Sequence, residues 1–208
     1  MGYYPILLDM TGKRCVVIGG GAVAERKAEG LLQVEADVTV ISPRLARRLE
    51  SLAQEGKIGH AAREYRPGDL AGYDLAFVAT DDDEVNVAVF REGKARGVWV
   101  NAADDPAHCD FILPSVLRRG DLIVAVATGG SSPALSRAIR EDLEAYFTAE
   151  YATLVRIVAE VREELRERPA FPDPEDWRMA LDGELHRLVK EGDQEGAKAY
   201  LFKRLGAI

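Results

Sequence analysis

A glycine cluster directly after a short apolar run is the first feature of the chain that could hold a ligand. Residues 15–18 read Cys-Val-Val-Ile, Gly19 and Gly21 follow, and Ala24 takes the third small position of a G-x-G-x-x-G/A pattern. In that pattern the first glycine permits a tight turn, the second lets backbone approach a pyrophosphate, and the third small residue lets a helix pack closely on a strand. The phosphates would lie on free N–H groups at the helix N-terminus. The pattern predicts a dinucleotide site, and the plain alternative is an ordinary turn.

The residues after the next predicted strand, 37–41, bear on which dinucleotide would bind. That strand arrives roughly 20 residues after the first glycine, as the dinucleotide fingerprint requires. An acidic residue commonly binds the ribose at its end, but this chain has Ser42, Pro43 and Arg44 there. A serine can still hydrogen-bond a ribose, whereas Arg44 could meet a 2′-phosphate. The residues alone leave the choice between NAD and NADP open.

Two aspartates follow the predicted strand at residues 98–101 and could carry chemistry. A carboxylate at Asp104 or Asp105 could take a proton from a substrate or orient the substrate beside a nicotinamide. Considered alone, Asp-Asp-Pro is more often a solvated turn, because aspartate and proline are common turn residues. Both interpretations stay open at this point.

A run of three aspartates follows another apolar strand, residues 74–79. Thr80 and Asp81 are closest to the strand end and could approach the cofactor. Asp82 and Asp83 are better explained by solvation and helix capping, with Asp83 as a candidate cap for a helix that runs to about Arg96.

A second glycine-rich loop precedes a predicted helix in the second half of the chain. Its residues are Thr128, Gly129, Gly130, Ser131, Ser132 and Pro133. Ser132 is a good N-cap and Pro133 a good first helical residue, so the loop could present a helix N-terminus to substrate carboxylates. The alternative is a loop that needs glycine only for flexibility. The arginines near this loop that could supply positive charge are Arg118, Arg119, Arg137 and Arg140. Exposed arginines on a helix, however, usually face solvent.

Alternating strand and helix patterns up to about residue 105 predict a parallel sheet with right-handed crossovers. The predicted strands are 15–18, 37–41, 58–65, 74–79 and 98–101, a helix is expected over 43–55, and residues 3–8 form a short edge strand or an extended arm. Ligands bind beyond the carboxyl ends of such strands, so the first glycine loop, Ser42, residues 80–83 and residues 101–105 are expected at one edge.

The pattern changes after a boundary near residues 110–115. Residues 111–117 and 122–127 are apolar segments typical of a hairpin. The remaining chain is helical in character, with a helix beginning at Pro133 and later helices over about 175–190 and 194–204.

Composition and charge exclude several classes of function. The chain has 208 residues, 47% hydrophobic and 30% charged, with a net charge of −8. This acidity argues against general nucleic-acid binding, and no apolar run approaches the ~20 residues of a membrane span. We expect a cytoplasmic protein, because the two cysteines are far apart and no export signal is present. We expect no metal site, because the histidines do not have the spacing of metal ligands.

Three ordered blocks together resemble the siroheme synthase N-terminal family, over about residues 3–147. The blocks are VVIGGGAVAERKAEGLL, ATDDDEVN and VNAADDPAHCDFILPSVLRRGDLIVAVATGGSSPALSRAIREDLE. The resemblance implies an α/β protein: a Rossmann-type parallel sheet with NAD (residues 1–112), a dimerisation and substrate module (113–147) and a helical C-terminal region (148–208). It implies a homodimer whose cleft binds an acidic tetrapyrrole.

The family's members oxidise precorrin-2 to sirohydrochlorin with NAD, a step toward siroheme, and some also insert ferrous iron. By position, Asp104 matches the family's catalytic aspartate, and Ala22, Val23, Pro43 and Arg44 match its NAD-contacting pairs. Thr128 stands where some members carry a phosphorylatable serine. The residues expected to bind substrate are Asn101, Arg118, Thr128, Gly129, Gly130, Ser131 and Arg137.

Three functional hypotheses remain distinct at the sequence level. The first is a precorrin-2 dehydrogenase alone, and the second is a bifunctional dehydrogenase and ferrochelatase in which Asp104 also serves chelation. The third is a non-catalytic Rossmann module that senses NAD(H). The strong resemblance of the blocks over residues 101–133 disfavours this third hypothesis.

Overall fold

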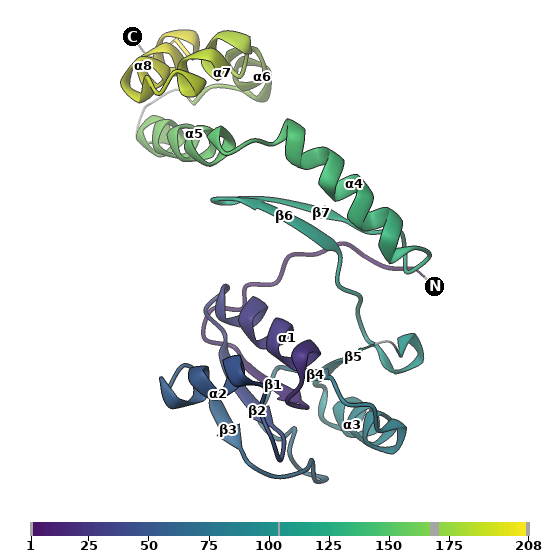
Figure 1. The fold of residues 1–208 in the computed structure, drawn as a ribbon. Coiled ribbons are helices and arrows are strands. Elements are labelled where there is room, and N and C mark those ends of the chain that lie inside the picture. The colour runs from purple at the N-terminus through teal and green to yellow at the C-terminus, as the bar shows by residue number, and fades with distance from the viewer. Residues whose placement is uncertain (1, 104, 167–170, 207–208) are drawn as a thin grey trace. The chain divides into compact units, whose positions relative to one another are not determined.

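The computed structural model describes residues 2–103, 105–166 and 171–206 (Figure 1). The chain divides into two compact units, Met1–Ile112 and Leu113–Ile208. The first unit therefore ends at the residue where the nucleotide-binding domain was expected to end. The second unit continues past residue 147, where a further boundary was expected.

A five-stranded parallel sheet forms the centre of the first unit, as the alternating pattern predicted (Figure 1). Its strands are β1 (Arg14–Ile18), β2 (Asp37–Ile41), β3 (Gly59–Ala61), β4 (Leu75–Val78) and β5 (Trp99–Ala102). The strand order β3-β2-β1-β4-β5 is that of the Rossmann dinucleotide-binding fold, which confirms the predicted fold class.

Helices cover both faces of this sheet because successive strand residues point to opposite sides. Cys15 and Val17 of β1 pack with helices α1 (Ala22–Leu32) and α2 (Arg47–Gln54). Val16 and Ile18 belong to a separate core that includes Val89 of α3 (Asp83–Arg96). All four residues of β1 named here are buried, so the apolar run is explained by burial on two faces.

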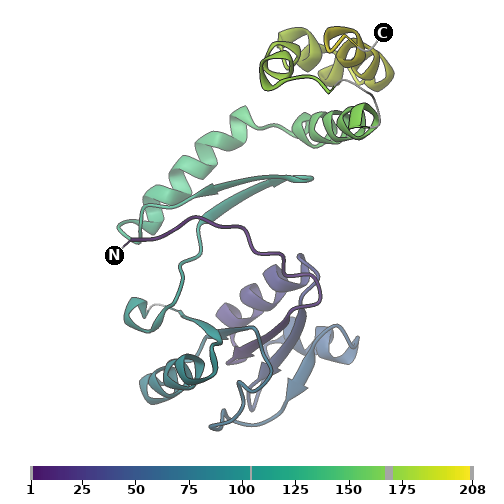
Figure 2. The same cartoon turned by 180° about the vertical axis from the view of Figure 1, so that it is seen from behind.

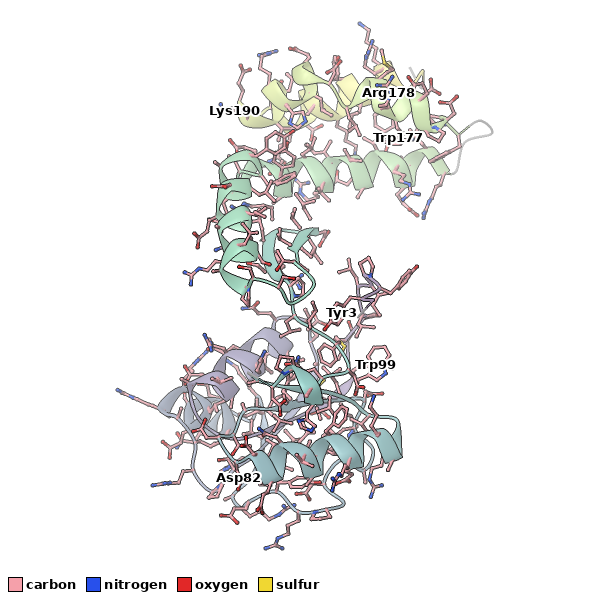
Figure 3. All side chains as sticks on the ribbon, turned by 90° about the vertical axis from the view of Figure 1, so that its right-hand side faces the viewer. Tyr3, Asp82, Trp99, Trp177, Arg178 and Lys190 are labelled. Atoms are coloured by element: carbon pink, nitrogen blue, oxygen red, sulfur yellow. The ribbon has the colours of Figure 1, made fainter. Side chains whose placement is uncertain are left out.

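Two local expectations for the first unit were wrong, on the start of α2 and on the cap of α3. The helix expected over residues 43–55 begins only at Arg47, because the preceding segment is held against the glycine loop: the Ala46 N–H donates to the Gly20 carbonyl at 2.7 Å. Asp82 caps α3 in place of Asp83, and its carboxylate accepts from two backbone N–H groups (Figure 3). Residues 3–8 form no strand and are exposed, which agrees with the extended arm, the second of the two alternatives expected there.

The second unit begins with a hairpin and continues as helices (Figure 1, Figure 2). The antiparallel strands are β6 (Ser115–Arg119) and β7 (Leu122–Val126), followed by α4 (Pro133–Tyr146), α5 (Glu150–Arg166), α6 (Pro174–Ala180), α7 (Gly183–Lys190) and α8 (Gln194–Arg204). The predicted hairpin is confirmed, and so is the Ser132 cap, whose hydroxyl accepts from the Leu135 N–H at 3.2 Å.

The helix expected over residues 175–190 is wrong, since it is two helices, α6 and α7. Asp182 starts the second of them by accepting from the Glu184 and Leu185 N–H groups. Helices α5 to α8 share a core of their own that includes Ile157, Leu185 and Leu201.

Candidate functional site

The carboxyl ends of four strands in the first unit lie at one edge of the sheet. In the strand register, Ile18 is paired with Ile41 and Val78, and Val78 is paired with Ala102. The segments that follow these residues therefore leave the sheet side by side. They are the glycine loop, residues 42–46, residues 79–82 and the turn after β5.

Two glycines of the first loop are required by neighbouring backbone. Gly19 has φ +116°, and a Cβ there would lie 2.1 Å from the Ala79 carbonyl oxygen. A Cβ on Gly20 would lie 2.0 Å from the Arg44 carbonyl oxygen. The loop is thus clamped between the segments that follow β4 and β2. The sequence analysis gave Gly20 no role, because its constraint comes from a residue that is distant in the chain.

Gly21 has the opposite environment and leaves room for a ligand. It is the N-cap of α1 in an extended conformation, and a Cβ there would meet nothing within 4 Å. No side chain caps the helix, and the N–H groups of Ala22 and Val23 have no partner among the described residues. Open space beside free N–H groups at a helix N-terminus suits a pyrophosphate, so the chain's own geometry fits a dinucleotide.

The segment after β2 has one buried hydroxyl that bonds within the loop and two residues that are exposed to solvent. Ser42 is buried, and its hydroxyl donates to the Arg44 carbonyl at 2.7 Å. The Ser42 proton is therefore used within the loop, which leaves only a lone pair for a ribose. Pro43 and Arg44 are exposed at the surface, where they can contact a ligand.

The segment after β4 is shaped by its own side chains. The Thr80 hydroxyl accepts from the Asp82 N–H at 3.2 Å, which turns the chain toward α3. Asp81 is exposed at the same edge and remains a candidate for cofactor contact.

The turn after β5 carries the predicted catalytic position, but Asp104 lies outside the described residues. Its flanks are fixed: the Ala103 N–H donates to the Val78 carbonyl at 2.8 Å, and Asp105 Oδ2 lies 2.6 Å from His108 Nδ1. Asn101 is buried, and its amide donates to the Phe111 carbonyl at 2.9 Å. The structure therefore gives Asn101 a role in holding the chain after β5. The pairing of Asp105 with His108 was missed, although their three-residue spacing was a signal for it.

The remaining predicted substrate residues lie in the second unit. Thr128 Oγ1 accepts from the Ser132 N–H at 3.0 Å and lies 3.1 Å from Ser136 Oγ, so it fixes the glycine loop to the start of α4. Gly129 and Gly130 have φ +61° and +83°, which glycine adopts readily. Ser131 is exposed on this loop.

The arginines of the second unit are mostly paired within it. Arg137 and Arg140 form ion pairs with Glu141, and Arg119 donates to the Phe147 carbonyl. Arg118 is exposed on β6 and is the freer candidate for a substrate carboxylate. The acidic partner of Arg137 and Arg140 reduces the unpaired positive charge near this loop, and the sequence alone does not show that pairing.

Within residues 2–103, 105–166 and 171–206, no three His, Cys, Asp or Glu side chains gather as ligands for an ion. In the same part of the chain, every helix is too short or too polar to cross a bilayer.

Comparison with known proteins gives matches along the whole chain. A family described as putative NAD(P)-binding matches residues 6–115, and the family of the sirohaem biosynthesis protein central region matches residues 119–146. The siroheme synthase of Chromobacterium violaceum is 41% identical over 211 residues, which cover 100% of this chain and 44% of that protein. That of Nitrosomonas europaea is 38% identical and covers 99% and 44%. The chain therefore spans less than half the length of these relatives.

A solved structure is similar over nearly the full chain. It is that of SirC, a precorrin-2 dehydrogenase, with a TM-score of 0.78 and 25% identity. The match covers 97% of this chain and 100% of that one, so the similarity includes both compact units.

Proposed function

The chain belongs to the family of siroheme synthase N-terminal regions, and from this premise we propose that it oxidises precorrin-2 to sirohydrochlorin with NAD. The observation that carries the proposal is the open space at Gly21 beside free N–H groups of α1, in a chain that matches a precorrin-2 dehydrogenase throughout. The reaction is a step of siroheme biosynthesis.

Each predicted cofactor-binding residue receives a role under this proposal. Gly19 and Gly21 form the pyrophosphate cradle, which the N–H groups of Ala22 and Val23 complete. Ser42, Pro43 and Arg44 would hold the adenosine ribose, and Thr80 and Asp81 would contact another part of the cofactor. NAD, when bound, supplies a hydride acceptor. These residues would hold NAD at the carboxyl edge of the sheet.

Substrate recognition rests on charge. Precorrin-2 carries eight carboxylates, which suit arginine side chains and helix N-termini. Arg118, Arg137 and the loop of residues 128–131 are the proposed carboxylate contacts. Asp104 is proposed to orient the macrocycle or to assist proton loss.

We also propose a homodimer formed through residues 113–147. Only Ser136 of α4 is buried, whereas Leu135, Ile139 and Tyr146 are exposed on the same helix. A two-stranded hairpin is marginally stable alone, so a second copy would give both the hairpin and α4 a larger core. A cytoplasmic location is consistent with the two free cysteines, Cys15 and Cys109.

An anaerobic assay with purified protein, precorrin-2 and NAD tests the function. Absorbance of sirohydrochlorin should appear with NAD, and ferrous iron is then added. Siroheme that forms faster than in an enzyme-free control would add ferrochelatase activity, the second of the three hypotheses. Tight NADH binding without precorrin-2 consumption would contradict the proposal and support the NAD(H)-sensing alternative.

A further inference from the structure

A carboxylate–imidazole pair stands in the turn after β5 and has no role in the function proposed above. Asp105 Oδ2 and His108 Nδ1 are 2.6 Å apart; Asp105 precedes the short 3₁₀ turn Pro106–His108, and His108 is the last residue of that turn. We propose that His108, oriented by Asp105, accepts the proton that leaves the macrocycle during its oxidation. This inference rests on the proposed dehydrogenase function and names a second residue for it.

The pair is held from several sides. The His108 N–H donates to the Asp105 carbonyl at 3.1 Å, and the Cys109 thiol contacts the same carbonyl at 3.3 Å. The thiol also donates to the Ala102 carbonyl at 3.2 Å, which ties the turn to the end of β5. The ring of Phe90 meets the imidazole edge to face, with centroids 5.2 Å apart. These contacts fix the orientation of the imidazole, as a proton acceptor requires.

The hydrogen bond also sets the tautomer. An ionised carboxylate can only accept, so Nδ1 of neutral His108 is the donor, and the lone pair lies on Nε2. Nε2 has no hydrogen-bond partner within the described part of the chain. The two side chains are 27% and 26% exposed, so the imidazole is accessible while most of the pair is shielded. An imidazole held at Nδ1 by a carboxylate is the arrangement of a general base.

The position of the pair matches the place where a base is needed. Ala102 at the end of β5 is paired with Val78, and Val78 with Ile18, which the glycine loop follows. The proposed dinucleotide site and the Asp105–His108 pair therefore share the carboxyl edge of one sheet, where ligands of this fold bind.

The chemistry balances as the loss of two electrons and two hydrogens. One C–H bond of precorrin-2 breaks and its electron pair leaves with the hydrogen as hydride to NAD⁺. A second hydrogen leaves a ring nitrogen or carbon as a proton, and the electrons of that bond complete the new conjugation of sirohydrochlorin. Nε2 of His108 takes this proton, and Asp105 stabilises the resulting imidazolium. The proton then passes to solvent.

Other charged groups lie near the pair and contribute to the electrostatic field around it. Asp110 and Cys109 are close in the chain, and Asp110 is paired with Lys94 of α3. Lys27 of α1 acts electrostatically on the Cys109 thiol, so it also lies near this turn. A pH profile must therefore be compared between variants that leave all four groups in place.

The decisive variant is His108→Asn, because asparagine can still donate to Asp105 from the Nδ1 position but has no basic nitrogen. Under anaerobic conditions with saturating NAD, we expect kcat to fall by about a hundredfold while NAD affinity is retained. The acid limb of the wild-type pH profile should disappear. His186→Ala, in the second unit, is the control for loss of an unrelated imidazole.

A rescue experiment separates a base from a structural side chain. Added imidazole should restore activity to His108→Ala, whereas triazole, of similar size but far weaker basicity, should not. Unchanged kcat in His108→Asn, or equal rescue by both compounds, would overturn the proposal. If the wild-type protein itself fails to oxidise precorrin-2, the proposed function fails. If only the variant comparison fails, the function stands and His108 is not its base.

Discussion

Three consecutive glycines show how different physical constraints select the same residue. Gly19 has positive φ, Gly20 touches the backbone at Arg44, and Gly21 faces open space. The spacing of the fingerprint predicts Gly19 and Gly21, because the motif requires one glycine for the tight turn and one for the approach of a pyrophosphate. Gly20 could not be predicted, since its constraint arises only when the segment after β2 folds back onto the loop.

Substitutions in this loop should separate ligand binding from folding. Gly21→Val places a side chain in the space proposed for the pyrophosphate, and its extended backbone tolerates a side chain. We expect NAD affinity to fall at least about tenfold, or about 1.4 kcal/mol, with little change in the thermal midpoint of the free protein. Calorimetric titration and thermal unfolding measure the two effects.

Gly20→Ala is the matched comparison, with the opposite expectation. Its methyl group would meet the Arg44 carbonyl at 2.0 Å, so the loop must shift and the free energy of unfolding should fall by about 1–3 kcal/mol. Normal NAD affinity in Gly21→Val would show that the pyrophosphate lies elsewhere.

At the scale of elements, the pattern of apolar residues predicts the strands of the sheet. It does not predict helix ends that depend on single hydrogen bonds. β1, β2 and β4 were predicted nearly to their ends because their apolar runs are buried on both faces. The start of α2 and the break between α6 and α7 were not predicted correctly. The first depends on the Ala46–Gly20 hydrogen bond, and the second on Asp182 capping a new helix within an apolar pattern.

Glu92 of α3 shows an element-level connection that no motif reveals. Its carboxylate accepts from Tyr65 Oη at 2.6 Å and from the Gly68 and Leu70 N–H groups at 2.9 and 3.1 Å. Burial acts to raise the pKa of Glu92, but these hydrogen bonds and one from Arg96 outweigh it and lower the pKa. One side chain thus anchors the segment between β3 and β4 to α3.

This arrangement predicts an acid-sensitive contribution to stability. Because the folded-state pKa lies below the unfolded value of about 4.3, the contribution is present above that pH and is lost as pH falls through the folded pKa. Glu92→Gln should lower the free energy of unfolding by about 1–3 kcal/mol at neutral pH and flatten its decline in acid. Denaturant titrations over a pH series, with the exposed Glu64→Gln as control, measure both effects. An unchanged acid slope in Glu92→Gln would rule the carboxylate out as a source of acid sensitivity.

At the scale of the molecule, the chain folds as two units with separate cores. The cofactor part of the proposed site lies within the first unit, and the sequence could therefore predict it. The proposed cofactor residues follow neighbouring strands, so topology alone brings them to one edge. The expected boundary at residue 147 was placed by resemblance, whereas Tyr146, Phe147 and Tyr151 pack together and join α4 to α5. The acidic partners of Arg137 and Arg140 lie on the same helix, so that part of the substrate prediction depended on side-chain pairing.

The exposed apolar surface of α4 gives the last prediction, on oligomeric state. Leu135 is 52% exposed and Ile139 37%, and both lie on one side of α4 because they are four residues apart. If a second copy covers this surface, Leu135→Glu with Ile139→Glu would place unpaired carboxylates in an apolar interface. The wild-type protein should sediment as a dimer and the double variant as a folded monomer, since a buried unpaired charge is strongly unfavourable.

The matched control places the same charge on an apolar side chain outside the proposed interface. Met179 of α6 is 53% exposed, and Met179→Glu should leave the dimer intact. Circular dichroism of each variant distinguishes a lost interface from a lost fold, because α4 contributes little to the buried core of its own chain. A double variant that still sediments as a dimer would show that this face of α4 is not the contact. A wild-type monomer at concentrations well above those of the activity assay would exclude the homodimer itself, and the apolar side chains of α4 would then need another partner.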